Sequence, residues 1–334
     1  MRCLVTNSNR LVTIFGGSGF LGRHVAHELA RRGWRIRIAT RRPDLAFSTQ
    51  PSGQVGQIMP VQANLRFPDS IAPAIQNADA VINLVGILRP RGPQTFEAIH
   101  ERGARAVAQS AKAAGIETFV HMSALGADPD SPSLYARTKA AGEAAVLETL
   151  PAAVILRPSV VFGPEDQFFN RFAAMARLMP ALPLIGGGKT KLQPVYVADV
   201  AESIGIALDG NAQSGKVYEL GGPEVASLKE IMRFVLKVTE RKRLLLPLPF
   251  PFAWMMGAAT EFAMAASLGF FPETFEITRD QVELLRRDNI VSEQAHSEGR
   301  TLMGLGIAPE SFHALEPAAL SRFRKTGRFT EQLA

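Results

Sequence analysis

The sequence of 334 residues has little of several residue types that mark particular classes of protein. Its single cysteine, Cys3, excludes a disulfide framework and a cysteine-rich metal site. The six histidines show no metal-ligand spacing, so we expect no metal. Uncharged apolar runs stay short of the roughly eighteen residues that a spanning helix needs. The residues before Leu11 are too few and too polar to predict a secretory signal.

Positive charge is concentrated at the amino end. The whole chain has a net charge of +6, but residues 1–44 hold nine arginines against two carboxylates, which leaves the remainder slightly negative. A nucleic-acid-binding protein would spread basic groups over a wider surface. We therefore expect no nucleic-acid partner, and we look for a local anion site near the amino end.

Short β-rich runs alternate with segments of helical spacing in the first half of the chain. The strand-like runs are 11–16, 34–39, 58–65, 80–86, 118–123 and 152–158, and the helical segments include 20–32, 94–114 and 134–149. This alternation predicts an α/β fold with a doubly wound parallel sheet of the Rossmann type. We predict a dinucleotide-binding domain over 1–163, with 190–220 returning to it. A smaller, mostly helical carboxyl-terminal domain would take 164–189 and 221–334.

The sharpest motif is GGSGFLG at 16–22, which fits Gly16-x-x-Gly19-x-x-Gly22. It follows a predicted strand and opens a predicted helix that includes Phe20 and Leu21, as a dinucleotide-binding turn does. The backbone amides at the start of that helix would then receive a pyrophosphate. The alternative is an ordinary glycine turn between a strand and a helix.

The end of the second predicted strand indicates which dinucleotide is bound. The sequence there is IATRRP, with Arg41 and Arg42 and no carboxylate before Asp44. An arginine at this place accommodates a ribose 2′-phosphate, whereas a carboxylate would accept from a free hydroxyl. With Arg23 in support, the pair favours NADP(H) over NAD(H), although it could instead cap a strand in solvent. Four further arginines (Arg31, Arg32, Arg35 and Arg37) have no assigned role.

A candidate catalytic set lies in the fifth strand–helix unit. Tyr135 and Lys139 are four residues apart on a predicted helix, so they share one face, and Ser123 ends the preceding strand. An ammonium beside a phenol favours the phenolate, and a strand-end serine could polarise a carbonyl. A tyrosine and a lysine at this spacing also arise by chance on many helices.

With these motifs, residues 11 to about 240 resemble the extended or atypical branch of the short-chain dehydrogenase/reductase superfamily. The resemblance also rests on ANL at 63–65, NLVG at 83–86 and LRPSVVFGP at 156–164. It implies roles for six further residues: Asn64 and Leu65 near adenine, Val85 and Gly86 near its ribose, and Pro158 and Val160 near nicotinamide. Two residues depart from the family pattern. Asn64 replaces the usual aspartate, and His100 replaces an asparagine that supports the proton relay.

Within that branch the chain looks most like the thirty-nine-kilodalton NAD(P)H-binding accessory subunits of respiratory complex I, in their α-proteobacterial form. The features are LVTIFGGSGFLGRHVA, the arginine pair, VINLVGIL, FVHMSALGAD and the run at 168–201. The resemblance implies tightly held NADPH without turnover and docking on other subunits of the peripheral arm. It also implies a peripheral place on the cytoplasmic face of a bacterial inner membrane, or on the matrix side in mitochondria.

Residues 244–271 form an apolar segment with one charge, Glu261, and with Pro247, Pro249 and Pro251 near its start. The prolines exclude a helix through 247–251. The rest could be a core helix, a partner surface or a membrane-interface segment. Two other functions stay open: a soluble NADPH-dependent reductase or epimerase using Ser123, Tyr135 and Lys139, and a redox-sensing regulator that binds NADP and a protein.

Overall fold

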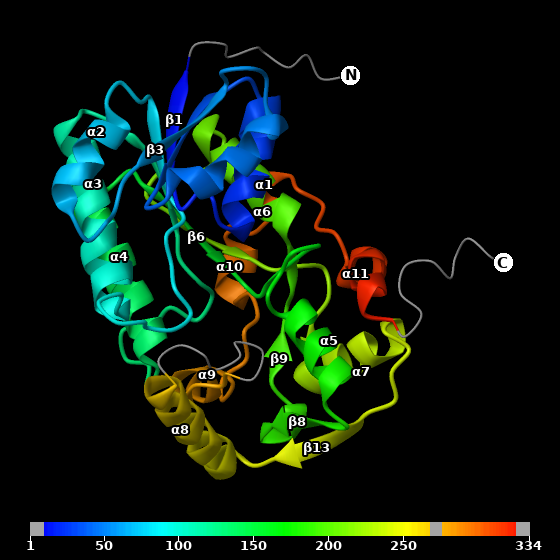
Figure 1. Cartoon of the computed structure of the whole chain (residues 1–334). Coiled ribbons are helices and arrows are strands. Elements are labelled where there is room, and N and C mark those ends of the chain that lie inside the picture. The colour runs from blue at the N-terminus through cyan, green and yellow to red at the C-terminus, as the bar shows by residue number, and fades with distance from the viewer. Residues whose placement is uncertain (1–9, 268–275, 325–334) are drawn as a thin grey trace. The chain divides into compact units, whose positions relative to one another are not determined.

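The computed structural model describes residues 10–267 and 276–324, which fall into two compact units (Figure 1). The first unit runs to Pro158 and resumes over Val197–Leu220 and Val291–Ala308. The second holds Ser159–Tyr196, Gly221–Ile290 and the chain from Pro309. The end of the apolar segment predicted at 244–271 lies outside the described residues.

A seven-stranded parallel sheet forms the first unit and confirms the predicted fold class. In spatial order its strands are β11 (Val217–Leu220), β6 (Val154–Pro158), β5 (Thr118–Met122), β4 (Ala80–Asn83), β1 (Leu11–Phe15), β2 (Arg35–Thr40) and β3 (Ile58–Gln62). From β1 the chain turns first toward β2 and β3 and later toward β4 and β5. The carboxyl ends of β1 and β4 are therefore the switch point, where such sheets bind their ligands.

Helices cover both faces of this sheet. Helices α2 (Ile71–Ile75), α3 (Ala104–Ala113) and α4 (Leu134–Thr149) lie on one face, and α1 (Phe20–Arg31) with α6 (Val197–Leu208) lies on the other (Figure 1). Buried apolar side chains from the strands and from α2–α4 fill the space between them, among them Phe15, Phe119 and Val107. Burial of this surface is the main stabilising contribution to the unit.

The segment predicted as one helix over 94–114 divides into two parts. A π-helical turn, η3 (Glu97–Gly103), precedes α3. This wider turn brings the carbonyl of His100 against α4 at Gly142, where a Cβ atom would lie 2.2 Å from the His100 oxygen. Only glycine permits this approach.

The boundaries between the units differ from the prediction that 190–220 returns to the first domain. Strands β9 (Lys191–Leu192) and β10 (Val195–Tyr196) pair with β12 (Ala226–Ser227) and β7 (Val161–Phe162), all in the second unit, so the return begins at Val197. The return of residues 291–308 was not predicted. Two hydrogen bonds hold it. The Ser292 amide donates to the Glu219 carboxylate at 2.8 Å, and the Glu219 amide donates to the Arg300 carbonyl at 3.0 Å.

The second unit contains helices and short strands around an aromatic core. Its elements include α5 (Phe169–Leu178), β8 (Ala181–Ile185), α7 (Leu228–Val238), β13 (Leu244–Leu248), α8 (Phe250–Ala266), α9 (Arg279–Leu284) and α11 (Phe312–Leu320). The rings of Phe162, Phe169 and Phe312 meet in its core. The exclusion of a helix through 247–251 was wrong at its end, because α8 begins at Phe250. Pro251 lies in the first turn, where proline is tolerated.

Helix α8 is neither a wholly buried nor a wholly exposed element. Ala253 is fully buried, and Gly257 approaches α9 so closely that a Cβ atom would lie 2.9 Å from the Arg279 nitrogen. Phe252, Met255 and Phe262 are 63%, 62% and 77% exposed. Within the described ranges, no helix is long and apolar enough to cross a membrane.

Three of the four unassigned arginines have protein partners. Arg32 contacts Glu28 (2.7 Å) and Asp209 (2.6 Å), and so joins α1 to the end of α6. Arg37 donates to the carbonyls of Ala74 and Gln76 at the end of α2, both at 2.9 Å. Arg31 lies 3.5 Å from Glu28 on the surface, and Arg35 is exposed at the start of β2. Arg32 and Arg37 therefore join elements of the fold, and Arg31 and Arg35 lie on the surface.

Candidate dinucleotide site

The glycine motif forms a tight turn between β1 and α1. Gly16 has a φ of +82°, which favours glycine, and its amide donates to the Ala39 carbonyl at 3.2 Å. A Cβ atom on Gly22 would lie 2.5 Å from the Gly16 oxygen, so α1 packs directly on the turn. Helix α1 starts after Gly19 with neither a side-chain cap nor an acidic residue in its first turn. Its first amides can therefore receive an anion.

A cavity of ≈ 350 Å³ lies beside this turn, at the switch point of the sheet. Ten residues predicted to bind the dinucleotide line it: Gly16, Gly19, Phe20, Leu21, Gly22, Arg41, Asn64, Leu65, Val85 and Gly86. Further lining residues that were not predicted include Ser18, Thr40, Arg66, Ile87, Gln94 and Ile99. Four strand ends and the segment at η3 therefore bring residues from five separate parts of the sequence to one hollow.

The arginines near this cavity separate into two kinds. Arg42 donates to the Asp44 carboxylate at 2.9 Å on the surface, and Arg23 donates to the Ser18 carbonyl at 3.1 Å. Arg41 and Arg66 line the cavity, and neither forms an ion pair with a carboxylate among the described residues. Two cations that pair with no carboxylate in the described part of the chain therefore line one hollow, which fits a phosphate group.

Arg66 was missed by the sequence analysis. It directly follows Asn64 and Leu65, and its guanidinium lies 5.5 Å from the centre of the Phe67 ring. The Asn64 side chain accepts from the Arg66 backbone amide at 3.2 Å, so the departure from aspartate is accommodated in a local turn. The available signal was a basic residue just after the third strand, beside the end of the second.

Lys139 reaches the end of β5, and Ser123 directly follows the last residue of that strand. Ser123 is 3% exposed, and its hydroxyl has no hydrogen-bond partner among the described residues. The Lys139 Nζ donates to the Met122 carbonyl at 3.1 Å and lies 6.0 Å from the centre of the Tyr135 ring. A Cβ atom on Gly86 would lie 3.1 Å from that Nζ, so Lys139 reaches the cavity wall from behind. Ser123, Tyr135 and Lys139 are not among the residues that line the cavity itself.

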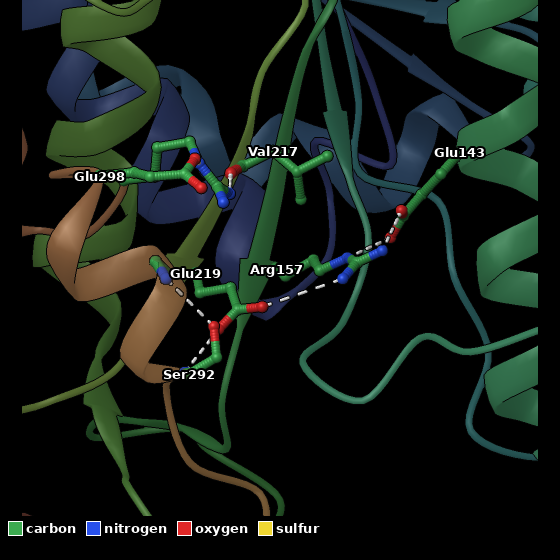
Figure 2. A network of polar contacts seen from close by, with 8 residues as sticks. Glu143, Arg157, Val217, Glu219, Ser292 and Glu298 are labelled. Carbon is green, nitrogen blue, oxygen red and sulfur yellow. Dashed lines mark hydrogen bonds and ion pairs between the residues drawn. The ribbon is translucent and has the colours of Figure 1, made fainter.

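Burial makes Lys139 a weaker base than usual. It lowers the pKa of Lys139 to about 8, against the opposing effect of the Glu143 charge one turn along α4. Arg157 holds Glu143 with two hydrogen bonds of 2.8 and 2.6 Å and lies 3.9 Å from Glu219 (Figure 2). This network fixes α4, and therefore Lys139, against β6 and β11.

His100 uses both of its ring nitrogens. Its Nε2 accepts from the Ile87 amide at 3.0 Å, and its Nδ1 lies 3.1 Å from the Thr138 hydroxyl. Because Nε2 accepts, Nδ1 carries the proton and donates to Thr138, whose hydroxyl in turn donates to the Leu134 carbonyl at 2.9 Å. Burial, and next the charge of Lys139, lowers the pKa of His100 to about 2, so the ring stays neutral.

A second buried histidine, His121, lies on β5. The side-chain amide of Asn83 contacts its Nδ1 at 3.3 Å, and its Nε2 has no partner among the described residues. Burial lowers the pKa of His121 to about 3, with the Lys139 charge as the second cause. His121 has no predicted role, because its position in the sequence lacks metal-ligand spacing.

The two residues predicted near nicotinamide belong to different units. Pro158 is the last residue of β6, where its carbonyl accepts from the Leu125 amide at 2.9 Å. Val160 lies in the second unit, and its carbonyl accepts from Val195 there at 2.9 Å. Their contact with a nicotinamide ring stays a prediction.

Known proteins resemble this chain over nearly its whole length. It is 36% identical over 326 residues to "NADH dehydrogenase (ubiquinone) 1 alpha subcomplex subunit 9, mitochondrial" of Arabidopsis thaliana, covering 96% of this chain and 79% of that protein. It is 30% identical to a ceramide reductase of Caulobacter vibrioides, over 89% of this chain and 90% of that one.

The fold also matches solved structures. An NADPH-dependent quinone oxidoreductase from Escherichia coli, solved with NADPH, superposes with a TM-score of 0.69 at 20% identity, over 92% of this chain and 99% of that one. At that identity the likeness shows the fold alone. Residues 12–221 match the model of the NAD dependent epimerase/dehydratase family. That match includes the glycine turn, the cavity and the Ser123–Tyr135–Lys139 set. The chain therefore belongs to the NAD dependent epimerase/dehydratase family, an extended short-chain dehydrogenase/reductase related to a subunit of NADH dehydrogenase.

Proposed function

We propose that this chain is an NADPH-holding accessory subunit of respiratory complex I that does not turn its nucleotide over. The observation that carries the proposal is the similarity to the Arabidopsis subunit across 96% of the chain, through both units. A likeness limited to the nucleotide-binding unit would suit any member of the family. The second unit is where a partner-specific surface would be retained.

The preference for NADPH rests on Arg41 and Arg66. They line the same cavity at the ends of β2 and β3 and lack an ion pair in the described part of the chain. A 2′-phosphate carries nearly two negative charges and accepts several hydrogen bonds, so it would satisfy both cations. A free ribose hydroxyl would leave them without an anion.

The lack of turnover rests on His100. Its two ring nitrogens are already used by Ile87 and Thr138, and its pKa of about 2 keeps it from carrying a second proton near neutral pH. It therefore offers no free group through which a proton could reach Lys139. In this proposal Tyr135 and Lys139 hold the nucleotide ribose and do not complete a catalytic cycle.

The proposed place of the subunit is the peripheral arm of complex I, against other subunits and close to the membrane. This corresponds to the cytoplasmic face of a bacterial inner membrane or the matrix side in mitochondria. The exposed apolar side chains of α8, Phe252, Met255 and Phe262, support a contact surface in the second unit.

Mild solubilisation tests this proposal. Membranes of the source organism are extracted with a gentle detergent and separated by native electrophoresis, with NADH dehydrogenase activity stained in the gel. The subunit should migrate with that activity, and alkaline extracts of the purified chain, in which reduced nucleotides survive, should contain NADPH in near-equimolar amount. A chain that migrates only at its own mass would contradict the proposal.

A second candidate function, a soluble NADPH-dependent reductase or epimerase, is favoured by Ser123. Its buried hydroxyl has no partner in the described ranges, as a group awaiting a substrate carbonyl would. Tyr135 would donate the proton, and Lys139, with its lowered pKa, would favour the phenolate that remains. The bound cofactor would supply the hydride.

This candidate predicts NADPH oxidation with some carbonyl substrate, including ceramide precursors with a keto group, and its loss in Tyr135→Phe. A broad panel of carbonyl compounds that gives no oxidation would remove it.

A further inference from the structure

One wall of the cavity is held at its far end by a hydrogen bond from a backbone amide to the side chain of a residue elsewhere in the sequence. The wall is residues 84–87, which follow β4 and line the cavity. The Leu84 amide donates to the Phe15 carbonyl at 2.9 Å, and the Val85 amide donates to the Asn83 side chain at 3.1 Å. These two bonds lie at the start of the wall. Its far end is held by the bond from the Ile87 amide to the His100 Nε2 at 3.0 Å.

His100 joins that wall to the helix that carries Tyr135 and Lys139. Its Nδ1–H donates to Thr138 of α4, so the ring connects the wall to α4 through two hydrogen bonds. The ring also stacks on Phe96 at 5.4 Å and meets the edge of the Tyr135 ring at 5.3 Å. His100 is 2% exposed, so solvent has little access to its ring nitrogens.

Only the backbone of the wall separates the cavity from Lys139 of α4 at Gly86. Gly86 lines the cavity on one side and approaches Lys139 on the other, where a Cβ atom would lie 3.1 Å from Nζ. Outward movement of the wall must therefore break the Ile87–His100 bond and leave the buried His100 nitrogen without its donor. Unpaired buried groups are costly, so such openings are rare while His100 is in place.

We propose that His100 is a positioning residue that fastens the cavity wall, residues 84–87, to α4 and thereby sets the rate at which bound dinucleotide leaves. This inference rests on the dinucleotide occupancy of the cavity and not on the assembly of the chain into a larger complex. It concerns the backbone wall of the cavity, and it is separate from the contacts that Arg41 and Arg66 would make with a phosphate group.

The test measures release from the full-length protein. The chain is loaded with NADPH, mixed with a large excess of NADP⁺, and the decay of bound-NADPH fluorescence is followed by stopped flow. His100→Ala should release NADPH roughly five- to thirtyfold faster, the factor expected for the loss of one hydrogen bond to a buried acceptor. His100→Gln, whose side-chain oxygen can accept from Ile87, should restore most of the slow release.

Two matched variants separate positioning from loss of stability. Val107→Ala removes buried side-chain volume in the core of the same unit and should lower the melting temperature with an unchanged release rate. Thr138→Val deletes the second partner of His100 and should accelerate release by a smaller factor, whereas Thr138→Ser should not. The Thr138 pair carries the test if His100→Ala does not fold.

Equal release rates in wild type and the His100 and Thr138 variants would overturn the inference. So would an acceleration in Val107→Ala as large as that in His100→Ala, because the effect would then follow stability alone. A wild-type chain that binds neither NADPH nor NADH would overturn the inference together with the proposed function. Tight binding with unchanged release would overturn only the inference.

Discussion

The arginines that line the dinucleotide cavity and the groups buried behind its wall differ in charge and in exposure to solvent. Arg41 and Arg66 offer charge close to solvent, without an ion pair among the described residues. His100, His121 and Lys139 do not line the cavity; they are buried behind its wall, and burial lowers the pKa of each. Charge near water attracts an anion but is screened by salt, whereas buried groups are insensitive to salt and sensitive to pH. The arginines can therefore select the ligand, while the buried groups hold the backbone around it.

The largest effect is expected from removing both cations. Arg41→Ser combined with Arg66→Ser should weaken NADPH binding by about a hundredfold, because each lost charge-assisted bond contributes about 1.5 kcal/mol near solvent. NADH affinity should change by less than about twofold. Fluorescence titration with both nucleotides measures the two affinities. Arg42→Ser is the matched control, because the Arg42 guanidinium already binds Asp44. An equal loss for NADPH and NADH would show that the arginines do not contact the 2′-phosphate.

Acid should expose the buried end of the comparison. Folding holds the pKa of His121 at about 3, below its ordinary 6.5, so the unfolded chain binds more protons in between and stability falls as pH drops through that window. Between pH 6.5 and pH 5, His121→Asn should lose about 2 kcal/mol less free energy of unfolding than wild type. Urea unfolding at both pH values measures the difference. A His121→Asn variant that loses as much free energy of unfolding as wild type between these pH values would contradict the buried, neutral assignment.

Lys139 should respond in the alkaline range. Its folded pKa of about 8 lies below the ordinary 10.5, so the unfolded chain again binds the extra proton, and stability rises as pH increases through that interval. From pH 8 to pH 9 the wild type should gain about 1 kcal/mol relative to Lys139→Met, which has no proton to release. Thermal unfolding at these pH values is the measurement. Parallel pH profiles in the two proteins would mean that Lys139 keeps its ordinary pKa.

The smallest effect should come from salt. Raising sodium chloride from 0.05 to 0.5 M should weaken NADPH binding about threefold and NADH binding less, because screening acts on the solvent-facing arginines. The doubly substituted arginine variant should lose this difference between nucleotides. If salt weakens NADH as much as NADPH, the cations act on the pyrophosphate that both ligands share.

The sequence was sufficient for the fold because its signals are local. The glycine turn and the alternation of strands and helices are read within short windows, and both the sheet order and the family match confirm them. It could not show which of Arg41 and Arg42 lines the cavity, because the two residues are adjacent in the chain. In the structure Arg42 binds Asp44 on the surface and Arg41 lines the cavity. The roles assigned to the individual site residues stay predictions until a nucleotide is bound.

The partners of His100 were beyond any local pattern. Ile87 is 13 residues away and Thr138 is 38 residues away, and no periodicity in the sequence relates them. Arg66 was missed for a related reason. It joins Arg41 only because β3 pairs with β2 in parallel, so that both strands end at the same edge. Such neighbours follow from the register of the sheet and not from spacing along the chain.

The carboxylate of Glu219 has a consequence for the order in which the molecule can be built. Its partners are Arg157, made earlier, and the Ser292 amide, made much later (Figure 2). During synthesis on the ribosome, the edge strand β11 emerges before the segment that completes its polar contacts. The nucleotide-binding unit can therefore reach its final form only after residues 291–308 have left the ribosome, when most of the second unit already exists.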